Sequence, residues 1–195
     1  MIKLRNTSRA AALFLTALGL AACDTIGDQL LDTVSGKIQL ACPSQNIVAV
    51  ASRRLTYRPG DGRDLTDIDN EIVIRSVALE CDSDVDRKTR AGSMQVSVTT
   101  IMEAVRGPAN RDRKTDVEYF VSVTDRANKI LYREAFVISI PFGENESRRD
   151  VVSQPVRLRI PIQSGQSGKN FRILVGLVIS RDQLEMNQRD RRPRL

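Results

Sequence analysis

Apolar and polar residues alternate over long stretches of this chain, and this alternation limits the possible folds more than any other feature of the sequence. Met94, Val96 and Val98 are apolar, and they are separated by Gln95 and Ser97. Successive side chains of a β-strand point to opposite faces, so a period of two predicts a strand with one buried face. We expect strands over residues 46–57, 71–80, 94–103, 117–124, 130–140, 156–162 and 171–180.

Turn signals separate these predicted strands, and no long helical pattern lies between them. Residues 58–62 read Arg-Pro-Gly-Asp-Gly, and Asp125 to Lys129 is typical of a hairpin loop. Ser180 and Gln183 match a capping box and predict a short helix over Arg181 to Gln188. The sequence therefore predicts an all-β fold, an antiparallel β-sandwich of about seven strands in the manner of an immunoglobulin or fibronectin type III domain. A small barrel is the alternative fold.

The first 22 residues have the composition of an export signal. Lys3, Arg5 and Arg9 form a positive start, and an apolar run from Ala10 to Leu20 follows. This run is too short to cross a bilayer as a helix, which takes about 20 apolar residues. Such a segment is a processing signal, and we leave residues 1–22 out of the expected fold.

Leu20-Ala21-Ala22-Cys23 resembles the lipobox of bacterial lipoproteins, with leucine and two small residues before a cysteine. The resemblance implies cleavage before Cys23, a thioether-linked diacylglycerol on its sulfur and acylation of its new amine. Several acyl chains give stable membrane anchoring. An ordinary secretory signal with an incidental Cys23 is the alternative. The whole chain resembles small lipoproteins of Gram-negative bacteria, and this resemblance supplies no function.

The lipobox also implies a location in the cell envelope, on a membrane that faces the periplasm. Asp24 follows the lipid-bearing cysteine. In the enteric type of sorting, an aspartate at this position implies retention in the inner membrane. Because that rule differs between bacterial groups, the choice between inner and outer membrane stays open.

Assigning Cys23 to lipid leaves Cys42 and Cys81 as an even pair in an oxidising compartment, where disulfides persist. We predict a disulfide between them, which the loop-entropy model values at roughly 3–4 kcal/mol. Antiparallel pairing of strands 46–57 and 71–80 would bring the two cysteines together. Two buried free thiols are the alternative. The chain has no histidine to complete a zinc site with them.

The predicted organisation has four parts: a signal peptide over 1–22, a lipidated tether over 23–40, the β-sandwich over 41–188 and a basic disordered tail over 189–195. The net charge of +6 comes from the signal and the tail, and the body is close to neutral. A nucleic-acid-binding face is therefore not expected. The tail could contact anionic lipid or an acidic partner through Arg189, Arg191, Arg192 and Arg194, or it could only add solubility.

The absence of histidine removes the commonest general base and every Ser-His-Asp arrangement. We expect the acidic runs over residues 64–71 and 82–86 to lie in loops. An EF-hand loop starting at Asp82 would have Arg87 at its sixth position and Ser93 at its twelfth, so the calcium-binding pattern fails. We therefore expect no catalytic residue, no metal site and no cofactor.

These observations predict a non-enzymatic envelope lipoprotein that acts as an accessory or scaffold subunit of an envelope assembly. Its partners would be the membrane, through Cys23, and another envelope protein. The alternative is a binding module for glycan, peptidoglycan or lipid, which would need an apolar pocket or exposed aromatic side chains. A carboxylate hydrolase is a third hypothesis, and it would need two acids that converge in one cleft.

Overall fold

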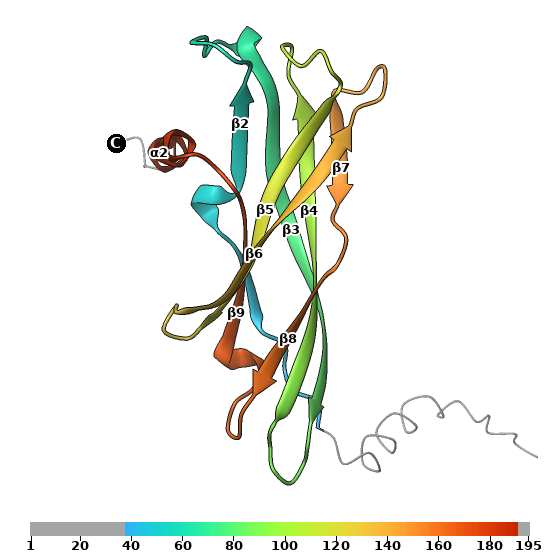
Figure 1. Cartoon of the computed structure of the whole chain (residues 1–195), viewed down its shortest axis with the longest axis vertical. Helices are drawn as coiled ribbons and strands as arrows, with labels where there is room; N and C mark the ends of the chain where they lie inside the picture. Colours follow the sequence, from blue (N-terminus) through green and yellow to red (C-terminus); the bar gives the residue numbers. More distant parts are fainter. Residues whose placement is uncertain (1–37, 191–195) are drawn as a thin grey trace, which may run out of the picture. The chain divides into compact units, whose positions relative to one another are not determined.

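Two β-sheets make up the computed structural model, which describes residues 38–190 (Figure 1). The first sheet has the order β1 (Ser44–Ile47), β9 (Phe171–Leu177), β5 (Lys114–Asp125) and β6 (Ile130–Pro141). The second has the order β2 (Arg53–Tyr57), β3 (Ile68–Val85), β4 (Gly92–Arg106) and β7 (Arg148–Val152), and β8 (Val156–Ile162) also pairs with β4. Cys23, Arg191, Arg192 and Arg194 lie outside the described residues.

The core lies between the two sheets and consists of the alternating residues that the sequence singled out. Met94, Val96 and Val98 of β4 are buried, as are Val121 of β5 and Val175 of β9. Their removal from water supplies the main stabilisation of the fold, at about 25 cal/mol per Å² of apolar surface. The predicted β-sandwich architecture is confirmed at the level of two strand-built sheets with one short C-terminal helix.

The first predicted strand, 46–57, is wrong as one unit, because the structure divides it between the two sheets. β1 runs parallel to β9, with Ser44 beside Arg172, and β2 runs antiparallel to β3, with Arg53 beside Val73. A 3-10 turn, η1 (Ala49–Ala51), carries the chain from one sheet to the other. The sequence conceals this crossing because the apolar residues continue through the turn.

A further strand, β7, lies within residues 144–154, between the predicted strands 130–140 and 156–162, where the sequence analysis expected no strand. It pairs with the upper part of β4. Its charged side chains are held by ion pairs, one from Arg148 to Glu103 at 2.5 Å and one from Arg149 to Glu146 at 2.7 Å. The strand depends on backbone pairing and these ion pairs more than on burial, so it carries little hydrophobic pattern.

The predicted disulfide is confirmed: Cys42 and Cys81 are joined, with their Cα atoms 5.8 Å apart. Its setting differs from the expectation. Cys42 precedes β1 of the first sheet, whereas Cys81 lies in β3 of the second sheet. The bond therefore links the two sheets along one side of the sandwich.

The segment before β1 follows β3 in the antiparallel direction. Hydrogen bonds connect Ile38 N to Val85 O at 3.1 Å and Leu40 N to Ser83 Oγ at 2.8 Å. Ile38 and Leu40 also pack against the core. The folded domain therefore begins before residue 41, and these residues do not belong to the tether to which the sequence assigned them.

The predicted helix is present as α2 (Arg181–Asp190), and Gln183 N donates to Ser180 Oγ at 3.2 Å as the capping signal requires. The helix continues two residues beyond the predicted end at Gln188. Arg189 therefore belongs to its last turn and not to the tail, a place where a cation is favoured by the helix dipole.

Candidate docking edge

The two sheets end in strands whose outer backbone groups have no strand partner, and such edges are templates for pairing with another chain. Within residues 38–190, the first sheet ends at β1 and β6, and the second ends at β2 and at the β7–β8 side of β4. Three of these edges are protected, and β6 differs from them.

The edge at β1 is closed by its own neighbours. The Cys42–Cys81 disulfide lies just before β1, and Gln45 Nε2 donates to Val77 O of β3 at 2.8 Å. These contacts tie the start of β1 to the second sheet. No strand from another chain could enter here without displacing them.

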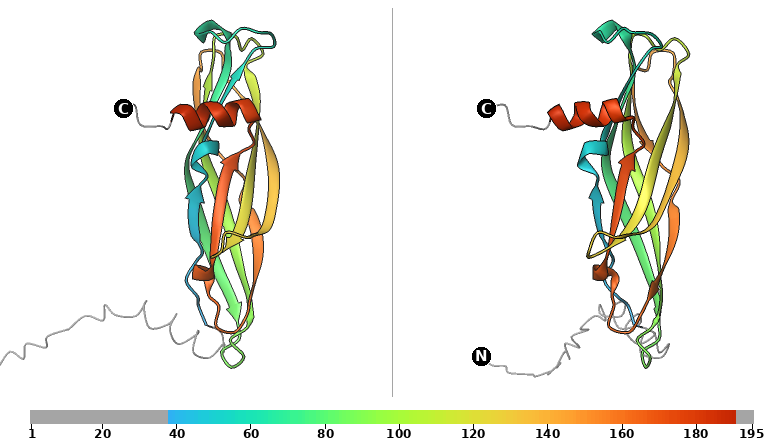
Figure 2. Two further views of the ribbon diagram at one scale, coloured as in Figure 1. Left: turned by 90° about the vertical axis from the view of Figure 1, so that its left-hand side faces the viewer. Right: turned by 60° about the vertical axis from the view of Figure 1, so that its left-hand side comes forward.

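The edge at β2 is covered by α2, which lies across the strands in Figure 2. Gln183 Oε1 accepts from Leu55 N at 2.9 Å, and Asn187 Nδ2 donates to Val50 O and Arg53 O, both at 2.8 Å. Gln183 and Asn187 are each only 6% exposed. Their side-chain amides thus occupy the place of a neighbouring strand. Sequence reasoning missed this role, because the two amides look like ordinary polar surface of a helix.

The edge formed by β7 and β8 is interrupted. Residues 153–155 separate the two short strands, and Pro161 in β8 has no N–H to offer. Arg157 and Arg159 are exposed on β8. Breaks, prolines and charges are the usual means by which proteins protect a strand edge.

β6 carries two charged residues, Arg133 and Glu134, and ends at Pro141, but it is unbroken, and no helix or disulfide covers its outer edge among the described residues. It contains 12 residues and pairs only with β5 among the described residues. Ile130, Leu131 and Val137 are large apolar residues of β6 that are 56%, 50% and 67% exposed. A long, continuous and apolar edge is an open template for strand addition.

The hydrogen bonds of β5 identify which backbone groups of β6 are free. Phe142 N donates to Arg113 O, and the register between the strands places Tyr119 beside Phe136. In an antiparallel pair, residues alternate between those that bond to the partner strand and those that point away. The backbone N–H and C=O groups of the even-numbered residues of β6 therefore bond to β5. The N–H and C=O groups at the free edge belong to Arg133, Ala135, Val137 and Ser139.

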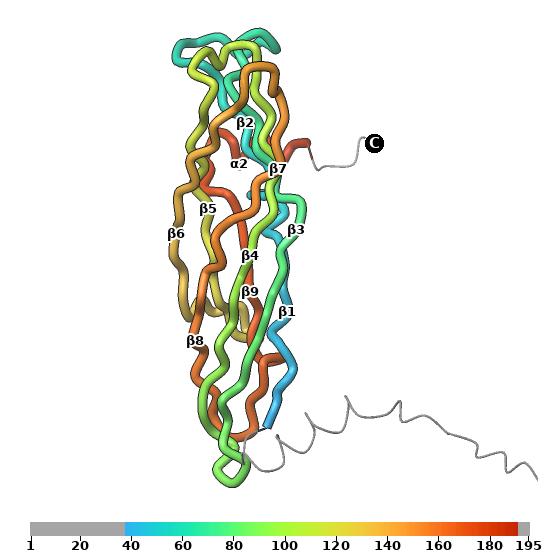
Figure 3. The backbone as a smooth tube through the Cα atoms, turned by 90° about the vertical axis from the view of Figure 1, so that its right-hand side faces the viewer, coloured from blue at the N-terminus to red at the C-terminus, as the bar shows by residue number. Residues whose placement is uncertain are grey.

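An apolar groove separates β6 from β8, and we call it the β6–β8 groove. Figure 3 shows the two strands along the same side of the domain. One hollow of about 420 Å³ and another of about 390 Å³ lie along it, and Arg157 borders both. The first is lined by Val123, Leu131, Tyr132, Leu158, Ile160 and Phe171, among others, and the second by Tyr119, Glu134, Phe136, Val137, Ile138 and Val156, among others.

Few polar groups interrupt this apolar surface. Tyr132 donates its hydroxyl to the Glu134 carboxylate. Burial raises the pKa of the Tyr119 phenol, and a hydrogen bond with Ser153 opposes that rise. The groove suits a ligand or segment that is mainly apolar and carries a few polar groups.

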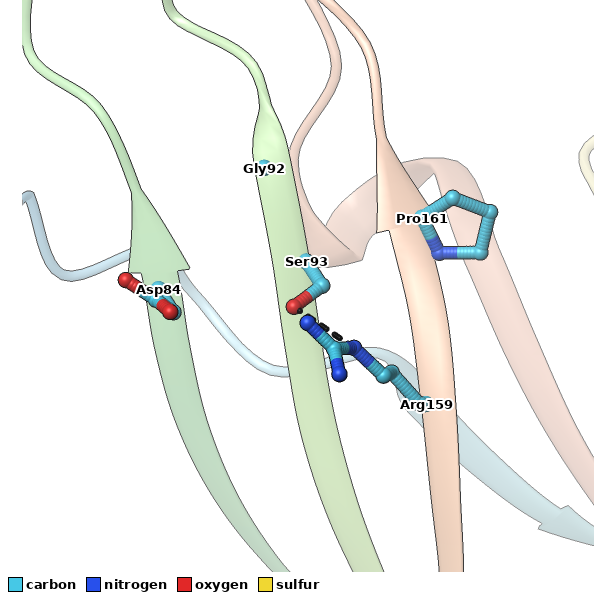
Figure 4. A pocket seen from close by; sticks show the side chains of 5 residues that line it. All are labelled: Asp84, Gly92, Ser93, Arg159 and Pro161. Carbon is cyan, nitrogen blue, oxygen red and sulfur yellow. Dashed lines mark hydrogen bonds between the residues drawn. The ribbon is translucent and has the colours of Figure 1, made fainter.

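A separate hollow of about 480 Å³ lies at the start of β4 and is lined by Asp84, Gly92, Ser93, Arg159 and Pro161. Figure 4 shows Arg159 pointing toward Ser93, whose Oγ accepts from Arg159 Nε at 3.1 Å. Gly92 permits the close approach of β3, because a Cβ there would lie 2.1 Å from Asp84 O. Asp84 is the one carboxylate among its lining residues, so the hollow has no acid pair for hydrolysis.

The acidic residues of the run 82–86 have structural roles in and beside β3. Asp82 and Asp84 lie within β3, not in a loop as predicted. The Asp86 carboxylate accepts hydrogen bonds from Lys88 N and Thr89 N. These hydrogen bonds lower the pKa of Asp86, and those from Thr89 have the largest effect. Among residues 38–190, no group of three or more possible acidic or cysteine ligands gathers around one point. Hydrogen bonds from arginines also lower the pKa of the Glu103 and Glu146 carboxyl groups. A general acid needs a raised pKa.

Comparison of the chain with protein-family models, with curated proteins and with solved structures finds no match. In the part that the structure describes, no helix is long and apolar enough to cross a membrane. Function is therefore argued from the site itself, since a fold alone does not define it.

Proposed function

We propose that this chain is a membrane-anchored lipoprotein of the bacterial cell envelope, and that its β-sandwich is a non-enzymatic adaptor. In this proposal the domain binds an extended segment of another envelope protein along β6. The observation that carries the proposal is the contrast among the strand edges. The other edges are cross-linked, covered by α2 or interrupted, whereas the outer edge of β6, the side away from β5, has no strand partner among the described residues.

Strand addition has a defined chemistry at this edge. The backbone groups of Arg133, Ala135, Val137 and Ser139 can exchange hydrogen bonds with an incoming strand. Alternate side chains of that strand would face the β6–β8 groove, where apolar residues of both sheets line the wall. Main-chain bonds then supply affinity, and the groove selects side chains.

The anchor in this proposal rests on Leu20 to Cys23, where the sequence resembles a lipobox. Lipid on Cys23 would hold the domain at the membrane surface, close to partners in the same membrane. Attachment to one surface raises the effective concentration of such partners, so a modest affinity at β6 would suffice.

We also propose that the sandwich is of the immunoglobulin or fibronectin type III kind in its architecture. Two mostly antiparallel sheets packed face to face support this, and so does a disulfide that links them. The parallel pairing of β1 with β9 places the first strand of the described chain beside its last strand.

A ligand-binding module is the second candidate, and the β6–β8 groove favours it. The hollow of about 420 Å³ combines Phe171 and Tyr132 with aliphatic residues. Such a hollow suits an acyl chain or another apolar ligand better than a sugar. The same experiment separates this candidate from the adaptor.

A photo-crosslinkable residue at position 137 of the full chain, expressed in cells, tests the proposal. We expect a discrete protein adduct after irradiation, because Val137 is 67% exposed at the free edge of β6. The same residue at the exposed position Gln188 on α2 is the matched control and should give no such adduct. Lipid or glycan adducts at position 137 without protein would support the ligand-binding module and contradict the adaptor.

Cys23→Ser in the same strain tests the anchor. The variant should move from the membrane fraction to the soluble fraction, and fractionation with immunoblotting measures this. Continued membrane attachment of the Cys23→Ser protein would refute lipid anchoring at this residue.

A further inference from the structure

The border of the β6–β8 groove carries unpaired positive charge. Arg157 and Arg159 are exposed along β8, and neither forms an ion pair within the described part of the chain. Arg133 of β6 lies over the Phe120 ring, 4.1 Å from its centroid. Glu134 is the one carboxylate that lines the two hollows, and it already accepts a hydrogen bond from Tyr132.

Some arginines elsewhere on the domain form ion pairs, whereas others, such as Arg111 and Arg181, form none within the described part. Ion pairs join Arg53 to Glu71, Arg58 to Asp67, Arg75 and Arg148 to Glu103, and Arg149 to Glu146. The arginines of these pairs are about 40–60% exposed, and the carboxylates neutralise their charge. The border of the groove therefore keeps a net positive charge that a partner could neutralise.

We infer that the segment bound at β6 is an acidic strand, in which apolar side chains alternate with aspartate or glutamate. This inference rests on the proposed function, because it assumes that the occupant pairs with β6. Apolar side chains of the added strand meet Phe136 and Ile138 in the groove. Carboxylates on the other face of the added strand lie on the outer face of the first sheet, the face that carries Arg133, and Arg157 and Arg159 add positive charge across the groove.

Charge complementarity of this kind affects association and partner choice more than total affinity. An acidic strand is attracted to the groove, and a basic strand of equal apolar content is repelled. Two border contacts at about 0.2–1 kcal/mol each, changed from attraction to repulsion, predict a difference of about tenfold in Kd. Salt should reduce the difference, because these charges are exposed.

Synthetic peptides as long as β6, 12 residues, provide the probe. One alternates valine with glutamate, a second valine with lysine and a third valine with serine. Binding to the detergent-solubilised full chain is measured by fluorescence anisotropy. We expect the glutamate peptide to bind about tenfold more tightly than the lysine peptide, and the serine peptide to bind with an affinity between the two. The double variant Arg157→Glu with Arg159→Glu should reverse this order. The control double variant is Arg111→Glu with Arg181→Glu, at two exposed residues that do not line the groove, and it should keep the order.

The outcomes separate this inference from the function on which it rests. If all three peptides bind equally and Val137→Pro abolishes their binding, strand addition stands and the acidic partner is refuted. If the glutamate peptide binds equally well to the Val137→Pro chain, pairing with β6 is refuted. Failure of the glutamate peptide to bind at all overturns the inference. Binding of the chain to phosphatidylglycerol vesicles also overturns it, if the double variant Arg157→Glu with Arg159→Glu abolishes that binding.

Discussion

Replacement of both Cys42 and Cys81 by alanine is expected to lower the free energy of unfolding by about 3–4 kcal/mol. The bond closes a loop between residues 39 positions apart, and its loss gives that loop more freedom in the unfolded chain. The bond also links the segment before β1 to β3, so its loss frees one side of the sandwich. Urea denaturation of both proteins under oxidising conditions measures the change.

The control for this prediction is the wild-type protein with a reductant. Reduction should move its urea midpoint to that of the double alanine variant and should leave the midpoint of the variant unchanged. Equal midpoints for oxidised and reduced wild-type protein would contradict the stabilising role of the disulfide.

Asn187→Ala is expected to lower the free energy of unfolding by about 2–4 kcal/mol. Its side-chain amide donates to Val50 O and Arg53 O, and it accepts from Gln183 Nε2 at 2.9 Å. The substitution leaves Val50 O of η1 and Arg53 O of β2 without the donor that Asn187 supplies. An acceptor that loses its partner costs about 1–3 kcal/mol when it is shielded from water.

Gln188→Ala on the same helix is the matched control, because Gln188 is exposed. Its effect should stay within about 0.5 kcal/mol. Hydrogen exchange adds a local measurement, since the amide of Leu55 depends on Gln183, which Asn187 holds in place. Equal stability of the two variants would show that α2 does not protect β2.

Local pattern predicted much of this fold. The alternating residues of β4 and β8 are visible in the sequence, because each such strand buries one face against the opposite sheet. The Cys42–Cys81 bond was predicted by counting the cysteines that remain when Cys23 is assigned to lipid, as its resemblance to a lipobox implies. The alternation depends on residues that are close in sequence, and the disulfide depends on the chemistry of the cysteines, so neither needs knowledge of the strand order.

Features set by the arrangement of the sheets could not be predicted. The division of 46–57 into β1 and β2 depends on pairing with β9 and β3, which lie far along the chain. β7 depends on ion pairs across strands. The role of Asn187 is visible only when α2 lies against β2.

The candidate site combines both kinds of information. β6 and β8 were both predicted as strands, and the alternating burial of β8 leaves Arg157 and Arg159 exposed. Strand order decides that β6 is an edge and that β8 lies across a groove from it, and no local pattern contains that order. The tail arginines were therefore more conspicuous in the sequence than the arginines at the groove.

Capture of a partner by Val137→Pro and Val137→Thr chains tests the central claim most directly. Proline removes the free-edge N–H of residue 137 and leaves the bonds between β5 and β6, which come from even-numbered residues, in place. Threonine keeps that N–H and the β-branched shape. After crosslinking in cells and affinity purification, we expect the threonine variant to retain the partner and the proline variant to lose it by about tenfold or more. Equal recovery of the partner by both variants, with both domains folded by circular dichroism, would contradict strand addition at β6.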